Sequence, residues 1–356
     1  MSGTRSGTPA DPRPGGDPAA AARAELVRQI RAGGHLGDAR WRAAFEDVPR
    51  HLFVPYYYVA TARGYQRLSG SDPDPQRRAR WLEGVYTDGA LATCMQDGEL
   101  VSSSSQPSLM AMMLEELRVE EAEEQRPGTG CRVLEIGTGT GYNAALLAHR
   151  LGDGRVTTVD LDEEITGPAQ ERLAAAGRRP TVVTGDGARG CPERAPYDRV
   201  IATCALPSVP PAWIAQCTPG ALILAPLATG LIALRVTDPA AVRAEGRFLA
   251  TPAYFVPLRT RSDPGARPGP EKPDTPGRRR DFRFGYGLPR EVLRDERFQF
   301  LWTLTADGLT PREALVLWQR ENRPRRERFG VTVHDTRQYA WLDSPDGAHR
   351  WPLPGG

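Results

Sequence analysis

The sequence VLEIGTGTGY, residues 133–142, constrains the fold of this chain more than any other stretch. A short apolar run containing the acidic Glu135 is followed by glycines at positions 137, 139 and 141. The apolar and small residues 143–148 then predict a helix. A strand, a glycine-rich turn and a helix N-terminus form a nucleotide-binding βα unit, in which glycine lets the backbone turn sharply and a ligand approach closely.

Acidic residues follow two further predicted strands of the same region. Residues 155–160 predict a strand that ends at Asp160, about twenty residues past the glycines, where such folds hold the hydroxyls of a ribose. After a helix over 162–176, a strand over 181–184 runs into Gly185-Asp186-Gly187, and residues 195–202 predict a fourth strand with its entry turn. Because the carboxyl ends of parallel strands meet at one edge of a sheet, these acids are expected on the ligand-binding side.

Alternating glycines also occur in dinucleotide sites and in plain turns, so the glycine run alone leaves the ligand open. The Gly-Lys-Ser/Thr ending of a P-loop is missing, and the substrate-reducing centre of a dehydrogenase is not visible. The order Glu-x-Gly-x-Gly-x-Gly, Asp160 and Gly-Asp-Gly is similar to that of methyltransferases that use S-adenosylmethionine. We therefore expect an α/β fold, with a Rossmann-like class I methyltransferase sheet and S-adenosylmethionine as cofactor.

Segments outside the glycine turn resemble protein-L-isoaspartate O-methyltransferases. They are the VPR and FVP elements within 48–55, VYTD at 85–88, the SSQP loop at 104–107 with the helix after it, APYD at 195–198, and Val209-Pro210 before Trp213. With the glycine turn and the Gly-Asp-Gly element, the resemblance covers residues 40 to 227 in the family's order. It is specific, because an upstream Ser-Gln-Pro loop is not a general feature of Rossmann-like methyltransferases.

The resemblance implies a role for each residue that falls on a family motif. Ser105 is the implied catalytic residue beside the substrate carboxylate, and the implied substrate-binding residues are Ser104, Gln106 and Pro107. The implied cofactor-binding residues are Glu135, Gly137, Thr138, Gly139, Gly141, Asp160, Leu161, Asp186 and Gly187. Ser104 stands where the family often has isoleucine, which leaves the choice between Ser104 and Ser105 open, and Asp160 replaces the more usual glutamate. A helix N-cap is the alternative role for Ser105, since Pro107 suits a first helical turn.

Composition narrows the partners and the compartment. The formal net charge of the 356 residues is +2, so no global basic field points to nucleic acid. The five cysteines include no CxxC pair, which predicts reduced thiols, a cytoplasmic protein and no metal site. No stretch suits a signal peptide or a membrane-spanning helix, so we expect no membrane partner.

Pattern and composition predict four regions. They are a disordered tail over 1–20, an N-terminal helical segment with the substrate loop over 21–105, an S-adenosylmethionine-binding domain over 106–236, and a C-terminal α+β extension over 237–356 that recognises the peptide substrate. Within them we expect helices over 21–31, 38–48, 288–294 and 311–320, a surface insertion over 64–80, a charged loop over 118–130, an antiparallel edge of two strands over 221–236, and a mobile linker over 262–280.

The residues past 235 suggest a second resemblance, to an actinobacterial branch of the family that sits beside ribosomally made, post-translationally modified peptides. It rests on GRF at 246–248, FVPLR at 255–259 and the segment 329–345, for which we expect no counterpart in the repair enzymes. Members of this branch are associated with ATP-grasp ligases or lanthipeptide synthetases, and they methylate an Asp that then closes to an aspartimide. The leading hypothesis is methylation of an Asp side chain in a modified precursor peptide, leading to aspartimide or isoaspartate. The alternatives are repair methylation of isoaspartyl residues in damaged proteins, and a non-catalytic module that recruits a peptide to a partner enzyme.

Overall fold

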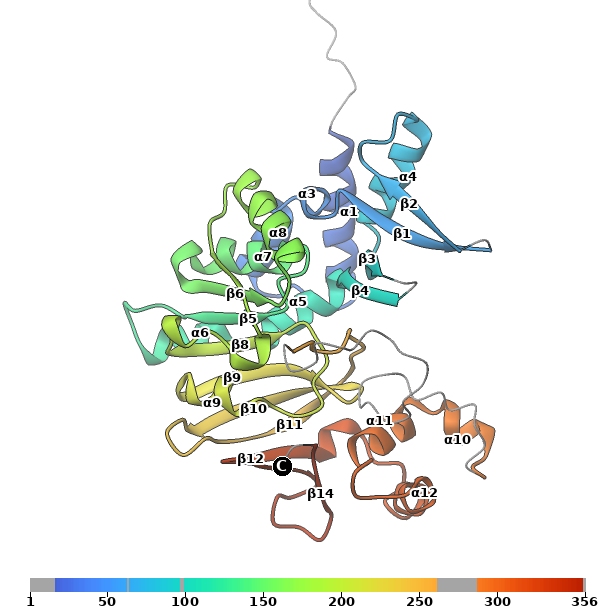
Figure 1. Cartoon of the computed structure of the whole chain (residues 1–356), viewed down its shortest axis with the longest axis vertical. Helices are drawn as coiled ribbons and strands as arrows, with labels where there is room; N and C mark the ends of the chain where they lie inside the picture. The colour runs from blue at the N-terminus through green and yellow to red at the C-terminus, as the bar shows by residue number, and fades with distance from the viewer. Residues whose placement is uncertain (1–16, 63, 97–98, 261–286, 355–356) are drawn as a thin grey trace, which may run out of the picture.

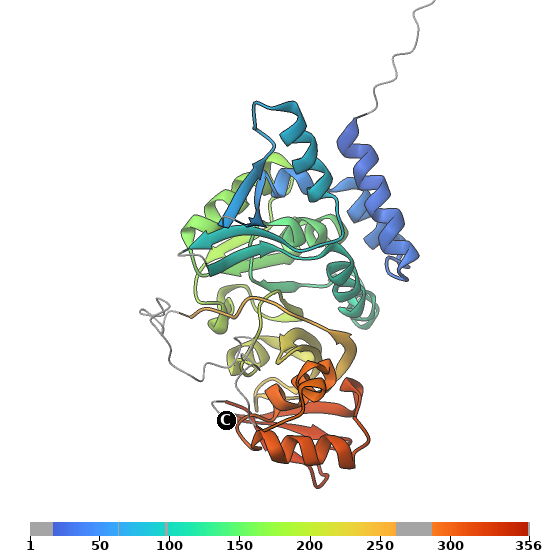
Figure 2. The ribbon, with the colours of Figure 1, turned by 90° about the vertical axis from the view of Figure 1, so that its right-hand side faces the viewer.

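The computed structural model describes residues 17–62, 64–96, 99–260 and 287–354. A sheet in the order β14-β13-β12-β11-β10-β9-β8-β5-β6-β7 runs through the long axis of the molecule (Figure 1). The N-terminal elements lie toward one end of this axis and the C-terminal elements lie at the other, as the turned view also shows (Figure 2). The chain therefore builds outward in both directions from a central parallel sheet.

The central sheet has the arrangement that the glycine turn predicts. Its strands are β5 (Val133–Ile136), β6 (Val156–Asp160), β7 (Thr181–Thr184), β8 (Tyr197–Ala202) and β9 (Cys217–Leu227), and each pairs in parallel with its neighbour. The order β7-β6-β5-β8-β9 reverses direction between β5 and β8, and ligands of such sheets bind outside the carboxyl ends of the strands at that point. The predicted class I methyltransferase fold is confirmed.

Helices and short 3-10 turns precede β5 and connect these strands. They are α5 (Pro107–Glu116), α6 (Val119–Gln125), α7 (Tyr142–Leu151), η1 (Asp153–Arg155), α8 (Glu163–Ala175), η2 (Gly187–Arg189), η3 (Pro192–Arg194) and α9 (Pro211–Ala215). The charged loop expected over 118–130 is wrong in part, because α6 occupies most of it. Val119 and Ala122 lie three residues apart on one face of α6 and are buried, while Glu120 and Glu124 are exposed. The sequence pattern did not predict this short amphipathic helix, because most of its residues are charged.

The N-terminal segment contains strands as well as the predicted helices. Its helices are α1 (Pro18–Ala32), α2 (Ala39–Asp47), α3 (Arg50–Phe53) and α4 (Pro75–Val85), and its strands are β1 (Tyr56–Thr61), β2 (Gly64–Ser69), β3 (Leu91–Gln96) and β4 (Glu99–Ser104) in the order β2-β1-β3-β4. Asp38 caps α2, as predicted. Residues 64–80, expected as a surface insertion, do lie largely at the surface, but they form β2 and the start of α4, which the sequence pattern did not predict. Of the tail expected over 1–20, residues 1–16 lie outside the described residues and Pro18 opens α1.

The C-terminal residues continue the same sheet. Antiparallel strands β10 (Gly230–Asp238), β11 (Arg243–Pro252), β12 (Phe329–His334), β13 (Arg337–Leu342) and β14 (Arg350–Pro352) follow β9, with α10 (Arg290–Arg294), α11 (Glu296–Leu304), α12 (Pro311–Arg320) and η4 (Arg326–Arg328) between β11 and β12. The antiparallel pair of strands expected over 221–236 is confirmed, but its position at an edge is wrong, since β9 and β10 are interior strands. The boundary predicted after residue 236 falls inside β10, and the linker expected over 262–280 lies outside the described residues.

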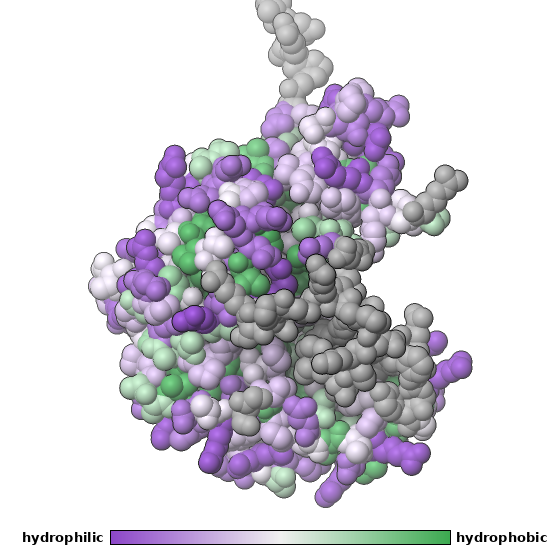
Figure 3. Space-filling view, viewed as in Figure 1, coloured by the Kyte–Doolittle hydropathy of each residue, from purple (hydrophilic) through white to green (hydrophobic). Residues whose placement is uncertain are grey.

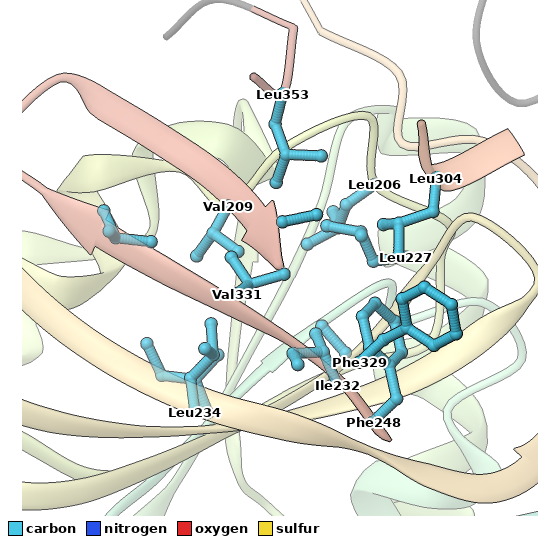
Figure 4. Packing of buried hydrophobic residues seen from close by; sticks show 14 of the residues in the cluster. Leu206, Val209, Leu227, Ile232, Leu234, Phe248, Leu304, Phe329, Val331 and Leu353 are labelled. Carbon is cyan, nitrogen blue, oxygen red and sulfur yellow. The ribbon is translucent and has the colours of Figure 1, made fainter. Parts of the chain in front are cut away.

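One hydrophobic core joins the C-terminal elements to the central sheet. Ile232 of β10, Phe248 of β11 and Phe329 of β12 point into a common cluster with Leu304 of α11 (Figure 4). The rings of Phe248 and Phe300 meet edge to face with centroids 4.8 Å apart. Strand pairing and a shared core make β11 and β12 depend on each other for their stability.

None of the helices in the described ranges has the length and apolar content needed to cross a bilayer. Hydrophilic side chains dominate the face shown in Figure 3.

Candidate active site

A cavity lies at the carboxyl ends of the parallel strands, beside the switch point between β5 and β8. It measures about 800 Å³ out to its open mouth, which is in the range of small-molecule sites. The glycine turn forms one wall, the end of β4 forms the opposite wall, and residues 256–259 close a third side. Of the predicted site residues, the cavity is lined by Gly137, Thr138, Gly139, Asp160, Leu161, Gly187, Ser104 and Ser105.

The glycine turn needs glycine for a different reason at each position. A Cβ on Gly137, whose φ is +97°, would lie 2.6 Å from Thr203 Oγ1. A Cβ on Gly139, with φ of +51°, would point across the cavity toward Ser102 and Ser103 of β4. Gly141 does not line the cavity, and a Cβ there would lie 3.3 Å from the carbonyl oxygen of Ala169 in α8. Gly137 therefore permits close packing against Thr203, Gly139 keeps the cavity open, and Gly141 permits close packing of two helices.

Asp160 ends β6 at the rim of the cavity. Its Oδ2 accepts a hydrogen bond from Gly139 N at 3.0 Å, and its Oδ1 accepts one from Leu161 N at 2.9 Å. Burial raises the pKa of this carboxyl, and the two backbone hydrogen bonds oppose the shift. The carboxylate is thus held beside the glycine turn, in the position that the sequence predicts for a ribose-binding acid.

The third wall comes from a segment far along the chain. Ala205 N donates to Val256 O at 2.8 Å, and Leu258 N donates to Ala205 O at 2.9 Å, so residues 256–258 run beside the loop after β8. This pairing brings the guanidinium of Arg259 within 3.7 Å of Asp160 and 2.5 Å of Asp162. Sequence reasoning marked Arg259 only as part of the FVPLR segment and missed it as a site residue, because the local sequence does not show the long-range backbone pairing that brings it to the site.

Two predicted cofactor-binding acids, Glu135 and Asp186, do not line the cavity themselves. Glu135 is fully buried, and its Oε1 accepts from Asn143 Nδ2 at 2.7 Å. Asn143 lines the cavity, so Glu135 reaches the site through Asn143. Asp186 caps η2 by accepting from Ala188 N at 3.0 Å, which places Gly187 at the cavity wall.

The buried carboxyl of Glu135 leads to a prediction about pH. Burial raises its pKa from 4.5 to about 7, so the folded protein holds a proton that the unfolded chain releases at lower pH. The stability from this proton is complete below pH 4.5 and is lost as pH rises through 7. Glu135→Gln removes the charge and should stabilise the apoprotein by about 3 kcal/mol at pH 8 and by much less at pH 5. Urea denaturation of both proteins across this range checks it; a pH-independent difference would contradict it.

The substrate loop separates the roles of its two serines. Ser104 is buried, and its Oγ accepts from Arg50 Nη2 at 3.3 Å. Ser105 is half-buried, and its Oγ has no hydrogen-bond partner among the residues that the structure describes. Ser105 lines both the cavity and a second hollow bounded by Gln106, Met112 and Phe255. Gln106 occupies the N-cap position of α5, which begins at Pro107, so the alternative role of Ser105 as N-cap is wrong.

Asp88 fastens the other side of this loop. Its Oδ1 accepts from Ser108 N at 2.8 Å, and its Oδ2 accepts from Gln106 Nε2 at 3.2 Å. Asp88 belongs to the VYTD element and Arg50 to the VPR element, both of which carried the family resemblance without an assigned role. These motifs, separate in sequence, meet at the substrate loop.

Known proteins are similar to this chain in sequence and in fold. The family model for protein-L-isoaspartate(D-aspartate) O-methyltransferase matches residues 77–262. The protein-L-isoaspartate O-methyltransferase of Methanoculleus marisnigri is 36% identical over 68% of this chain and 93% of its own length. Protein-L-isoaspartate O-methyltransferase 1 of an Anaeromyxobacter species is 36% identical over 66% of this chain and 94% of its own length.

A solved structure of a protein-L-isoaspartate O-methyltransferase matches with a TM-score of 0.56 and 22% identity, over 93% of this chain and 98% of the other. Such coverage includes most of the C-terminal strands and helices. The family model also extends past residue 235, through the FVPLR segment. The expectation that the tail past 235 has no counterpart among proteins of this name is therefore wrong.

Proposed function

Because this chain belongs to the protein-L-isoaspartate(D-aspartate) O-methyltransferase family, and is thus an S-adenosylmethionine-dependent carboxyl O-methyltransferase, we propose that it methylates the free carboxylate of an isoaspartyl residue in a peptide or protein. The observation that best supports this substrate is the position of Ser105. Its unpartnered hydroxyl lies where the cavity meets the second hollow, so a carboxylate entering from that hollow would meet a hydrogen-bond donor beside the cofactor.

The residues around the cavity fit S-adenosylmethionine, which supplies an electrophilic methyl group when bound. Gly137 and Gly139 leave room for the backbone to approach the cofactor closely, and a Cβ at Gly139 would fill part of the cavity. Asp160 offers a carboxylate to a pair of ribose hydroxyls. Leu161 and Leu258 provide apolar contacts on the same side.

The substrate needs orientation rather than activation. A carboxylate is ionised at neutral pH, so no general base is required. The protein must align one oxygen with the methyl carbon and exclude water. A hydrogen bond from Ser105 Oγ would fix the carboxylate. Among the described residues that line the two hollows, Arg259 and His35 are the only basic ones, and Arg259 already pairs with acids. The reacting carboxylate would thus avoid a strong ion pair that would make it a weaker nucleophile.

Transfer of a labelled methyl group tests the proposal. Two peptides of one sequence, one with L-isoaspartate and one with L-aspartate, are incubated with the full-length protein and labelled S-adenosylmethionine. We expect base-labile label in the isoaspartyl peptide alone. Absence of transfer to both peptides, with cofactor binding established by calorimetry, would reject the isoaspartyl substrate. Any turnover would also exclude the non-catalytic module.

A second candidate substrate is an Asp of a ribosomally made, modified precursor peptide, whose methyl ester closes to an aspartimide that can open to isoaspartate. The face of the sheet formed by β11–β14, mostly beyond the family model, favours it. This face carries four exposed arginines that form no salt bridge among the described residues, and two aromatic residues beneath them: Arg243, Arg247, Arg337, Arg350, Tyr339 and Trp341. The charge of Arg247 acts on the Asp343 carboxylate, and one acid, Glu245, lies on the same face, so the basic character rests mainly on the other three arginines. Such a face suits an acidic peptide segment. An ATP-grasp ligase or a lanthipeptide synthetase would then act in the same pathway.

Charge reversal separates the two substrates. The triple variant Arg243→Glu, Arg337→Glu, Arg350→Glu should lose turnover of an acidic precursor peptide and retain turnover of the short isoaspartyl peptide. If the variant turns over both peptides as wild type does, this face no longer supports the precursor peptide as the substrate. Deletion of residues 262–356 is a poorer test, because it removes β12 from β11 and opens the core around Phe248.

A further inference from the structure

We propose that Arg50 is a positioning residue for the methyl transfer, which fixes the backbone of Ser104 and Ser105 so that the Ser105 hydroxyl faces the substrate carboxylate. The inference rests on the carboxyl methyltransferase activity proposed above. Arg50 opens α3, directly after Val48-Pro49. It lines neither hollow, so it would act through the loop and not by touching substrate or cofactor.

The guanidinium of Arg50 joins two segments that are separate in sequence. Nη1 donates to Val85 O at 2.8 Å and to Thr87 O at 3.2 Å. Nη2 donates to Gly89 O at 3.2 Å, to Ser104 Oγ at 3.3 Å and to Ser105 O at 3.0 Å. One planar group therefore ties the turn between α4 and β3 to the end of β4.

Every acceptor of Arg50 is neutral. The side chain is 0% exposed, and no carboxylate among the described residues forms an ion pair with it. Burial lowers its pKa to about 10, so the group keeps its charge at neutral pH. The Asp88 carboxylate opposes this fall in pKa but forms no salt bridge with Arg50, so the buried cation depends largely on its hydrogen bonds. The Ser105 carbonyl is therefore held tightly, because moving it would leave the charge less well solvated.

Arg50 and Asp88 hold the loop from opposite sides. Arg50 binds the carbonyl of Ser105, while Asp88 binds the amide of Ser108 and the side chain of Gln106. Asp88 itself lies between Thr87 and Gly89, whose carbonyls Arg50 also binds. The two residues thus form one unit around the substrate loop. This arrangement leaves the Ser105 hydroxyl without a hydrogen-bond partner among the described residues.

Lysine at position 50 would keep the charge and lose the geometry. An ammonium is a single point with three donors, and it cannot reproduce a planar fork that reaches five acceptors on two segments. Misplacement of a positioning group by about 1 Å can cost as much as 100-fold in rate. Arg50→Lys should therefore act on the chemical step while leaving the cofactor cavity in place.

Arg199 offers a matched control. It is 1% exposed and donates to the carbonyl oxygens of Leu117, Arg118 and Asp198, at 2.6, 2.6 and 2.8 Å. It lies in β8 away from the cavity lining. Arg199 also forms a salt bridge with Glu121 at 3.9 Å, which has no equivalent at Arg50. Arg50→Lys and Arg199→Lys both disturb buried hydrogen bonds to backbone carbonyl oxygens, and only the network of Arg50 touches the substrate loop.

The experiment compares wild type with both lysine variants in kcat toward the isoaspartyl peptide, in Kd for S-adenosylmethionine, and in hydrogen exchange of the amides around 104–108. For Arg50→Lys we expect kcat to fall by about 10-fold or more, Kd to stay within about two-fold, and exchange of the loop to accelerate. Arg199→Lys should leave all three near wild type.

Three results would overturn the positioning role: unchanged kcat in Arg50→Lys, an equal loss in Arg199→Lys, or a Kd that rises in proportion to the lost activity. If wild type itself does not methylate the peptide, the isoaspartyl proposal fails. In that case unchanged loop exchange in Arg50→Lys still overturns the proposal for Arg50, and faster exchange supports it.

Discussion

Replacement of Gly139 by valine should abolish binding of S-adenosylmethionine. The backbone at Gly139 has φ of +51°, a region that β-branched residues rarely occupy. The new side chain would also project across the cavity toward Ser102 and Ser103. In addition, Gly139 N anchors Asp160 Oδ2, so a shifted backbone would displace the ribose-binding carboxylate. Strain, blocked space and a displaced carboxylate act together, and calorimetry should show affinity reduced by about 100-fold or more.

Gly154→Val is the matched control for this substitution. Gly154 has an ordinary φ, and a Cβ there would meet no atom within 4 Å. The same change of residue at that position should leave affinity near the wild-type value. If a folded Gly139→Val protein binds S-adenosylmethionine with near-normal affinity, the assignment of the cofactor to this cavity is wrong. Circular dichroism of both variants separates this result from a failure to fold.

The sequence predicts the parts of the fold that repeat a local pattern. Apolar strands, each followed by glycine or an acid, mark β5, β6 and β7 and place Asp160 at the cavity rim. Thr310 and Pro311 mark the start of α12, which begins at the predicted residue. In these places propensity, capping and burial all favour the same structure.

Other elements depend on partners that lie far away in the sequence. The interior position of β10 follows from its pairing with β11, and the pairing of β11 with β12 crosses about eighty residues of chain. Arg259 enters the site because residues 256–258 pair with the loop after β8. Arg50 resembles any surface arginine until the turn at 85–89 closes over it. Local pattern carries no information about such pairings.

Ser105→Ala should lower kcat toward the isoaspartyl peptide by about 100-fold, the cost of removing one donor from a preorganised site. The Ser105 hydroxyl has no partner among the described residues, so its loss should cost little stability. It lines the cavity at the junction with the second hollow, and cofactor affinity should change little. A fall in kcat with unchanged Kd for S-adenosylmethionine is the expected result.

Ser104→Ala distinguishes the two neighbouring serines, a choice that the sequence leaves open. The Ser104 hydroxyl accepts from Arg50, so its removal takes one of five acceptors from a buried cation. That variant should lose about 1–2 kcal/mol of unfolding free energy and only a few-fold in kcat. Ser105→Thr keeps a hydroxyl and should recover part of the activity that alanine loses. If Ser104→Ala is the slower enzyme, and Ser105→Thr is no better than Ser105→Ala, then Ser104 orients the substrate and the hydroxyl of Ser105 is incidental.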